Sequence, residues 1–337
     1  MRWLVVTDTH GDMDVINTLI ERTQADACLH CGDFGFYDAD SVDRLEEREL
    51  RLRWKHSDLP AADRRLAFEM ERGELVERMR AAGLLSTFVP YLEGARRFLA
   101  PVYAVWGNHE DAEVVKALRD GALTVENLHV VDEHSAFELG EGVTLFGCGG
   151  NFYAEGEGLF TPGLTGRGGK VRGSFVQLAR VLERMRASRS PVKLLMTHVS
   201  PGKVRLLERL ALVGGATVAL SGHMGPPNHN VWSLFTICEP EEAMARSAGE
   251  LAHLRVLWAS SHEARALSAS DRAVVERALE WLDVPALEPP ERGRRAPKGS
   301  LLDRYRATTF VNLTDADRGW GVLEVEGESV SWQGHLW

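Results

Sequence analysis

Short apolar runs that alternate with helical patterns are the feature that most restricts what this chain can fold into. Runs such as "RWLVVTD", "ADACLHCGD" and "PVYAVWGN" end in small or polar residues, and amphipathic patterns such as "DVINTLIERTQ" and "SFVQLARVLERMRAS" lie between them. Strands that alternate with helices predict a layered α/β domain. Near the end, "TTFVNLT", "WGVLEVE" and "ESVSWQG" alternate like antiparallel edge strands. We therefore expect a mixed sheet rather than a purely parallel one.

Two stretches interrupt this alternation. Residues from about 36 to 99 are charged and helix-patterned, and residues from about 239 to 306 are helical before they turn into the Pro/Gly/Arg-rich "ALEPPERGRRAPKGS". We interpret both as mostly helical insertions into one domain that spans residues 1–337.

Residues that can bind metal follow several of the predicted strands. The motifs are "VVTDTHGD", "HCGDFG", "VWGNHED", "LLMTHVSPG" and "ALSGHMG". Because the carboxyl ends of the strands in an α/β sheet open on one crevice, we expect these side chains to meet there. Carboxylate and imidazole ligands together suit a pair of divalent cations. Each motif alone is typical of a turn or of a structural histidine, and only their joint occurrence predicts a metal site.

The series D-x-H, G-D, G-N-H-E, T-H and G-H resembles the calcineurin-like metallophosphoesterase family. The resemblance extends from Met1 to about Leu234 and over the final hairpin, but over neither insertion. It implies a four-layered α/β/β/α sandwich with a two-metal site at one edge. It also implies the following roles by position: Asp8 and His10 bind the first metal, Asp33 bridges both, Asn108, His198 and His223 bind the second, and His109 lies beside the scissile phosphate without binding metal.

The chain departs from the family pattern at Gly225, where a histidine normally completes the shell of the first metal. Three alternatives stay open. In the first, Pro226 and Pro227 bulge the loop so that His229 reaches the metal. In the second, water or a remote side chain such as His335 takes the vacant position. In the third, the first metal site is weak or empty.

The resemblance implies a metal-dependent phosphoric ester hydrolase in which a metal-activated hydroxide attacks phosphorus. Mn²⁺ is expected, and Fe²⁺, Zn²⁺ or Ni²⁺ also suit these ligands. We expect His109 to protonate the leaving oxygen or to stabilise the phosphoryl group. Glu110 or Asp111 is expected to orient its imidazole, although Asp111 also fits the N-cap of the helix that follows.

The substrate is expected to be a phosphodiester in a nucleotide or nucleic acid. The stretch "LHCGDFGFYDAD", together with "GNHED", is loosely similar to the lariat-debranching branch of the family. The G-D-x-x-D-R-G pattern of protein Ser/Thr phosphatases is absent, because "FGFY" follows Asp33. A small-molecule phosphomonoesterase and a non-catalytic binding protein with a degenerate metal site are the alternatives.

Two basic segments are candidates for substrate contact. The glycine-rich "PGLTGRGGKVRGSF" is either a flap that grips phosphate or a surface loop, and its basic residues are Arg167, Lys170 and Arg172. The tail of the second insertion either touches nucleic acid or is a linker, and its basic residues are Arg292, Arg294, Arg295 and Lys298.

The charges of the first insertion are typical of a solvated helix face. Examples are Glu46, Glu47, Arg51 and Arg53.

The bulk composition restricts partners and compartment. With a formal net charge of −10, the chain lacks a strongly basic footprint for non-specific nucleic-acid binding, although bound metal ions can supply local positive charge. No apolar run approaches the roughly 20 residues that span a bilayer, and the apolar run in "MRWLVVTDTH" is too short for a secretory signal. We therefore expect a cytoplasmic protein. Cys28 and Cys31, three residues apart on a predicted strand, should point to opposite faces as reduced core residues.

Overall fold

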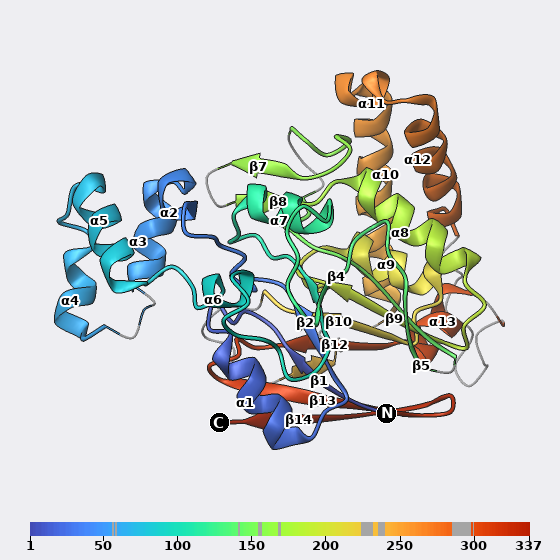
Figure 1. The fold of residues 1–337 in the computed structure, drawn as a ribbon. Helices are drawn as coiled ribbons and strands as arrows, with labels where there is room; N and C mark the ends of the chain where they lie inside the picture. Colours follow the sequence, from blue (N-terminus) through green and yellow to red (C-terminus); the bar gives the residue numbers. More distant parts are fainter. Residues whose placement is uncertain are drawn as a thin grey trace.

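Two six-stranded mixed sheets lie face to face, with helices on their outer sides (Figure 1). The computed structural model describes residues 1–55, 57, 59–140, 142–153, 157–167, 170–223, 232–234, 240–284, 298 and 300–337. The strand order is β14-β13-β1-β2-β3-β4 in the first sheet and β11-β12-β10-β9-β6-β5 in the second.

The first sheet combines a parallel set of strands with an antiparallel hairpin. Its strands are β1 (Arg2–Val6), β2 (Ala27–Cys31), β3 (Val102–Val105), β4 (Leu128–Val130), β13 (Gly319–Glu326) and β14 (Ser329–Leu336). Strands β1 to β4 are parallel, and β13 pairs antiparallel with both β1 and β14. The hairpin β13–β14 is antiparallel, as the sequence predicts.

The second sheet has a parallel centre and antiparallel edges. Its strands are β5 (Phe137–Gly140), β6 (Val143–Cys148), β9 (Val192–Thr197), β10 (Val218–Ser221), β11 (Trp232–Leu234) and β12 (Thr309–Leu313). The expectation that "TTFVNLT" forms an antiparallel edge strand is correct in one part and wrong in another. Strand β12 pairs antiparallel with β11, but it lies inside the sheet and pairs parallel with β10 on its other side. The polar Asn312 misleads the pattern, since it is buried and accepts a hydrogen bond of 2.9 Å from Ser221 Oγ.

Alternate side chains of the strands fill two separate apolar clusters. On β1, Trp3 and Val5 pack in the cluster between the sheets, whereas Leu4 packs with the helices outside. The same alternation on β2 places Cys28 in the outer cluster and Cys31 in the inner one, and both are buried free thiols. This arrangement agrees with the prediction that the C-x-x-C pair points to opposite faces.

Helices on the outer sides follow the amphipathic patterns of the sequence. They are α1 (Asp14–Thr23), α7 (Ala112–Arg119), α8 (Phe175–Ala187) and α9 (Arg205–Gly214). Helix α1 contacts β1 and β2, and α8 contacts β6. A short antiparallel ribbon, β7 (Thr165–Arg167) with β8 (Lys170–Arg172), precedes α8.

Most of the 36–99 segment forms a small helical group with an apolar core of its own, whereas Phe88, Tyr91 and Phe98 pack in the outer cluster. Its helices are α2 (Ser41–Arg44), α3 (Glu47–Lys55), α4 (Ala61–Leu66), α5 (Arg72–Ala82) and α6 (Val89–Leu92). Leu50, Trp54, Leu75 and Met79 belong to its core. In Figure 1, α2 to α5 stand together on one side of the molecule, away from α8 to α12.

The 239–306 segment instead extends the helical layer beside the second sheet. Its helices are α10 (Pro240–Ser260), α11 (His262–Ala266), α12 (Ala269–Leu282) and α13 (Leu301–Ala307). Helix α10 packs on α9, and α12 packs on α8. None of the helices in the described ranges combines the length and the apolar character needed to cross a membrane.

Candidate metal centre

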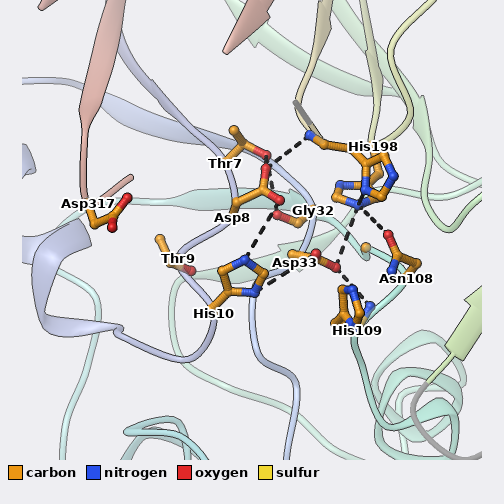
Figure 2. Close-up of polar contacts among 12 residues, drawn as sticks. Thr7, Asp8, Thr9, His10, Gly32, Asp33, Asn108, His109, His198 and Asp317 are labelled. Atoms are coloured by element: carbon orange, nitrogen blue, oxygen red, sulfur yellow. Dashed lines mark hydrogen bonds and ion pairs between the residues drawn. The ribbon is translucent and has the colours of Figure 1, made fainter. Parts of the chain in front are cut away.

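Loops that follow five strands of the two sheets bring the candidate ligands together (Figure 2). Within the described residues, two groups of side chains have ligand atoms that all lie within 4.8 Å of one another. The first group is Asp8, His10 and Asp33, and the second is Asp33, His198 and His223. Asp33 belongs to both groups and lies between them.

The ring of His198 presents an acceptor nitrogen to the acceptor oxygens of Asn108 and Asp33. Its Nδ1 lies 3.0 Å from the carbonyl oxygen of Cys31, so Nδ1 carries the proton and Nε2 carries a lone pair. That Nε2 lies 3.0 Å from Asn108 Oδ1, 3.1 Å from His223 Nδ1 and 3.6 Å from Asp33 Oδ1. Lone pairs that converge in this way repel one another unless a cation lies among them. A histidine that donates its other ring N–H to a backbone carbonyl is also typical of metal ligands. The donor set therefore fits a divalent metal.

His10 and His223 are held in the neutral form that binds metal. Burial and the neighbouring Arg53 lower the pKa of His10 to about 3. Burial and His198 lower the pKa of His223 to about 3 as well. His10 Nε2 lies 4.0 Å from Asp8 Oδ1, and its Nδ1 lies 3.9 Å from Asp33 Oδ2. Neutral imidazoles beside carboxylates are the ligand form that metal binding requires.

The two carboxylates concentrate negative charge in a buried place. Burial and the charges of Asp33 and Asp315 raise the pKa of Asp8 well above its usual range. Burial also acts to raise the pKa of Asp33, but His198 and its other histidine neighbours hold it below the usual range. Thr7 Oγ1 and the amide of His223 donate to Asp8 Oδ2 at 2.6 and 3.1 Å. These donors are uncharged, so they do not neutralise the negative charge of the carboxylates. A bound cation would neutralise it.

The backbone of the ligand residues is unusual. Asp8, His10, Asp33 and His223 all have positive φ, between 49° and 58°, which is uncommon outside glycine. Such conformations concentrate at functional sites, where the surrounding structure holds them.

Glycine precedes ligands where two loops approach closely. A Cβ atom on Gly107 would lie 1.9 Å from Asp33 Oδ1, and one on Gly222 would lie 2.0 Å from Thr7 Oγ1. The glycines of the G-N-H and G-H motifs therefore allow Asn108 and His223 to approach the loops after β1 and β2.

His109 is held on several sides. Its backbone amide donates to Asp33 Oδ1 at 2.8 Å, and its carbonyl accepts a hydrogen bond of 2.5 Å from the Tyr37 hydroxyl. Its ring Nδ1 lies 2.7 Å from Glu49 Oε2. Burial acts to lower the pKa of His109, but the hydrogen bond with Glu49 and the charge of Asp33 raise it above the ordinary value.

The expectation that Glu110 or Asp111 orients His109 is wrong. Glu110 is fully buried, and its two oxygens accept hydrogen bonds from the amides of residues 34–36 and of Gly107 at 2.7–3.1 Å. Burial and the charge of Asp33 raise the pKa of Glu110 to about 7. Asp111 is the N-cap of α7, where it accepts from the amide of Glu113 at 3.0 Å. The carboxylate nearest to the His109 ring comes instead from the 36–99 segment.

Arg53 also differs from its predicted place on a solvated helix face. Its side chain is buried, with 8% of the residue exposed, and it donates to the carbonyl of His10 at 2.5 Å and to that of His109 at 3.3 Å. Glu49 and Arg53 precede Leu50 and Trp54 by one residue each, so all four lie on neighbouring faces of α3. In the sequence, the four-residue spacing of Leu50 and Trp54 indicates which side of the helix is buried. It does not indicate that the metal site lies beside that side.

Of the predicted flap, the β8 strand adjoins the candidate ligands. The amide of Val171 donates to the carbonyl of Asn108 at 3.0 Å, and Val171 is buried. Lys170 and Arg172 flank it and project to the opposite face. The side chain of Arg167 lies outside the described residues.

Several other candidates do not join the ligand groups. Gly225 and His229 lie outside the described residues, as do Arg292, Arg294 and Arg295, whereas Lys298 is exposed. His335 belongs to neither ligand group, and it stacks on Trp320 at a centroid distance of 5.4 Å. Sequence reasoning missed Lys203, whose ammonium group donates to the carbonyl of His223.

Comparison with a known family agrees with this geometry. The family model described as calcineurin-like phosphoesterase matches residues 1–227. No curated protein matches the chain. Among solved structures, the chain is similar to the crystal structure of a hypothetical protein from Thermus thermophilus, with 14% identity, coverage of 100% of this chain and 99% of that chain, and a TM-score of 0.37. Because the family model matches more than half of this chain, the chain belongs to the calcineurin-like phosphoesterase family.

Proposed function

We propose that the protein is a divalent-metal-dependent phosphodiesterase that acts on a nucleotide or nucleic acid. The observation that carries the proposal is that Asp33 is common to two groups of candidate ligands. Asp8 and His10 would hold a first ion, Asn108, His198 and His223 a second, and Asp33 would bridge them. His229 is the candidate to complete the first shell. The proposal takes the two sheets and their helices as a four-layered α/β/β/α sandwich that forms one domain.

Bound ions supply Lewis acidity, which polarises a phosphoryl oxygen and lowers the pKa of water. Mn²⁺ is the expected ion. Asn108 contributes a neutral oxygen, so more positive charge remains to attract phosphate. His109 is the proposed catalytic residue, because Glu49 and Asp33 favour the protonated ring that can donate to the leaving oxygen.

The charges around the site favour a diester over a monoester. A diester carries one negative charge on phosphate, whereas a monoester carries up to two and needs more cationic partners. Within the described part of the chain, Arg53 and Lys203 are basic side chains at the ligands, and they donate to the backbone carbonyls of His10, His109 and His223. Lys170 and Arg172, with Arg167, are proposed to contact the rest of a longer substrate. A diester is also what the loose resemblance to the lariat-debranching branch implies.

Two chromogenic esters test the proposal. With Mn²⁺, the protein should hydrolyse bis-p-nitrophenyl phosphate faster than p-nitrophenyl phosphate, EDTA should abolish the activity, and added Mn²⁺ should restore it. Asp33→Asn should lose at least about 10²-fold, because it removes the carboxylate common to both ligand groups. Preference for the monoester would replace the diesterase assignment with a phosphomonoesterase. Turnover of neither ester, or of any nucleotide diester, would favour a binding protein.

A further inference from the structure

We propose that Glu49, on helix α3 of the 36–99 segment, is a positioning residue that fixes the ring of His109 for proton donation to the leaving oxygen. This inference rests on the proposed phosphodiesterase function. It assigns part of the active site to a helical segment whose sequence carries none of the metal-binding motifs.

The 36–99 segment supplies most of the contacts that hold His109. Glu49 Oε2 lies 2.7 Å from the ring Nδ1, while Tyr37 and Arg53 donate to the His109 carbonyl at 2.5 and 3.3 Å. From outside this segment, Asp33 Oδ1 accepts from the backbone amide of His109, and the ring of His10 contacts the His109 ring edge-on at a centroid distance of 6.2 Å. With Nδ1 occupied by Glu49, the ring is left with Nε2 as its remaining nitrogen for contact with substrate.

The surroundings of Glu49 argue against a role in stability alone. The residue is 2% exposed, and among the described residues its Oε1 atom is buried without a hydrogen-bond partner. A buried carboxylate oxygen that accepts no hydrogen bond costs folding free energy. An uncharged side chain of the same shape should therefore be tolerated by the fold, so we infer that the carboxylate serves the histidine.

Helix α3 is anchored so that Glu49 faces the site. Leu50 and Trp54 are buried in the core of the 36–99 segment, and Arg53, one turn after Glu49, binds the carbonyls of His10 and His109. Glu47 on the same helix points to solvent and pairs with Arg51. Glu47→Gln is thus a matched control that makes the same chemical change on a face away from His109.

The test compares Glu49→Gln with Glu47→Gln and the unchanged protein, each loaded with Mn²⁺. The substrates are the p-nitrophenyl and phenyl esters of thymidine 5′-phosphate, which differ only in the leaving group. Phenol is the poorer leaving group and depends more on protonation. Glu49→Gln should lower kcat for the phenyl ester about 10–100-fold, with a smaller loss for the p-nitrophenyl ester. KM, bound metal per chain and Tm should not fall, and Glu47→Gln should match the unchanged protein.

Equal losses for the two esters, no loss, or a loss of bound metal would overturn the assignment. A second readout needs no turnover, because ¹⁵N NMR of the Zn²⁺-loaded protein reports the His109 ring directly. The Nδ1 signal should shift in Glu49→Gln and stay in place in Glu47→Gln, and an unmoved signal in Glu49→Gln overturns the inference. If the unchanged protein hydrolyses neither ester, the proposed function fails, while the ring spectrum still decides whether Glu49 holds His109.

Discussion

His30 belongs to neither ligand group, but it contacts residues next to the candidate ligands. It is fully buried on β2, its Nε2 lies 3.0 Å from Thr9 Oγ1, and its Nδ1 accepts from the amide of Gly32 at 3.3 Å. Both partners adjoin ligand residues, namely His10 and Asp33. The neutral ring thus links the loops that follow β1 and β2, and burial lowers its pKa to about 3.

This buried ring should make the metal-free fold sensitive to acid. In the unfolded chain the His30 pKa is near 6.5, so that state takes up a proton below pH 6.5, whereas the folded state does not until about pH 3. The stability associated with this ring is therefore complete above pH 6.5 and falls as the pH drops toward 3, by up to about 1.4 kcal/mol per pH unit. In EDTA, His30→Asn should lower the free energy of unfolding at pH 7 but flatten its decline between pH 6.5 and 4.5. Urea unfolding measures this slope, and Thr9→Val, which keeps the titrating ring, should retain it. An unflattened slope in His30→Asn would contradict the prediction.

At the residue scale, the sequence predicted those site residues that follow strands. Asp8, Asp33 and His198 are placed by the strands that precede them, so local patterns are enough to find them. Glu49 and Arg53 reach the site from a helix that docks over a long sequence distance. The local sequence of this helix is charged and predicts a solvated face. The two side chains are buried only because the helix packs against the site.

Carboxylates of the 239–306 segment fix two elements beside the site. Glu263 on α11 accepts from the amides of Gly158 and Phe160 at 2.7 and 3.2 Å, in the loop that leads to the β7–β8 ribbon. Glu250 on α10 accepts from the amides of Arg205 and Leu206 at 3.1 and 2.8 Å, at the start of α9. Because the first amides of a helix have no partner within that helix, the added helix α10 satisfies two of them.

The β7–β8 ribbon should contribute to substrate binding through its charges. Lys170 and Arg172 flank Val171, which binds the carbonyl of Asn108. Changing both to Gln should raise KM for a dinucleotide by about 3–10-fold and weaken its dependence on salt, because it removes two positive charges, one half-buried at Lys170 and one exposed at Arg172. The kcat value should change little, since neither group touches the reacting atoms.

Steady-state kinetics at two ionic strengths measure both effects. The control changes Arg246 and Arg277 to Gln, which alters the net charge equally on exposed faces of α10 and α12. A KM that is the same in the ribbon variant and in this control would reduce the ribbon to a surface loop.

At the element scale, the sequence predicted the long, strongly patterned strands and helices best. Helices α1 and α8 lie within the patterns "DVINTLIERTQ" and "SFVQLARVLERMRAS" that predict them, because each presents one apolar face over several turns. Strands β7, β8 and β11 are three residues long, too short for a pattern. The place of β12 could not be read from alternation, because a buried hydrogen bond compensates its polar residue.

The candidate centre joins the two sheets. Asp8, Asp33 and Asn108 follow strands of the first sheet, whereas His198 and His223 follow strands of the second. The inner cluster between the two sheets consists of apolar side chains. The candidate ligands lie at the edge of the sheets, beyond this cluster. An ion bound here would connect the sheets and add its binding free energy to the stability of the whole fold, by about 2.7 kcal/mol at a free concentration of 100 times Kd.

Asp8→Asn should separate metal binding from the intrinsic stability of the fold. Burial and the charge of Asp33 raise the pKa of Asp8 in the folded state, so at pH 8 this carboxyl opposes folding when no ion is bound. In EDTA, Asp8→Asn should therefore have a Tm equal to or above that of the unchanged protein, since an amide oxygen can still accept from Thr7 and His223. Added Mn²⁺ should raise the Tm of the unchanged protein but not that of the variant. Asp317→Asn is the control, because Asp317 is exposed and lies apart from the cluster in Figure 2, and it should keep the full Mn²⁺ increment. The variant could instead have a lower Tm in EDTA and still show the full increase in Tm with Mn²⁺. That result would mean that Asp8 supports the fold and does not bind the ion, and that other residues connect the sheets through the ion.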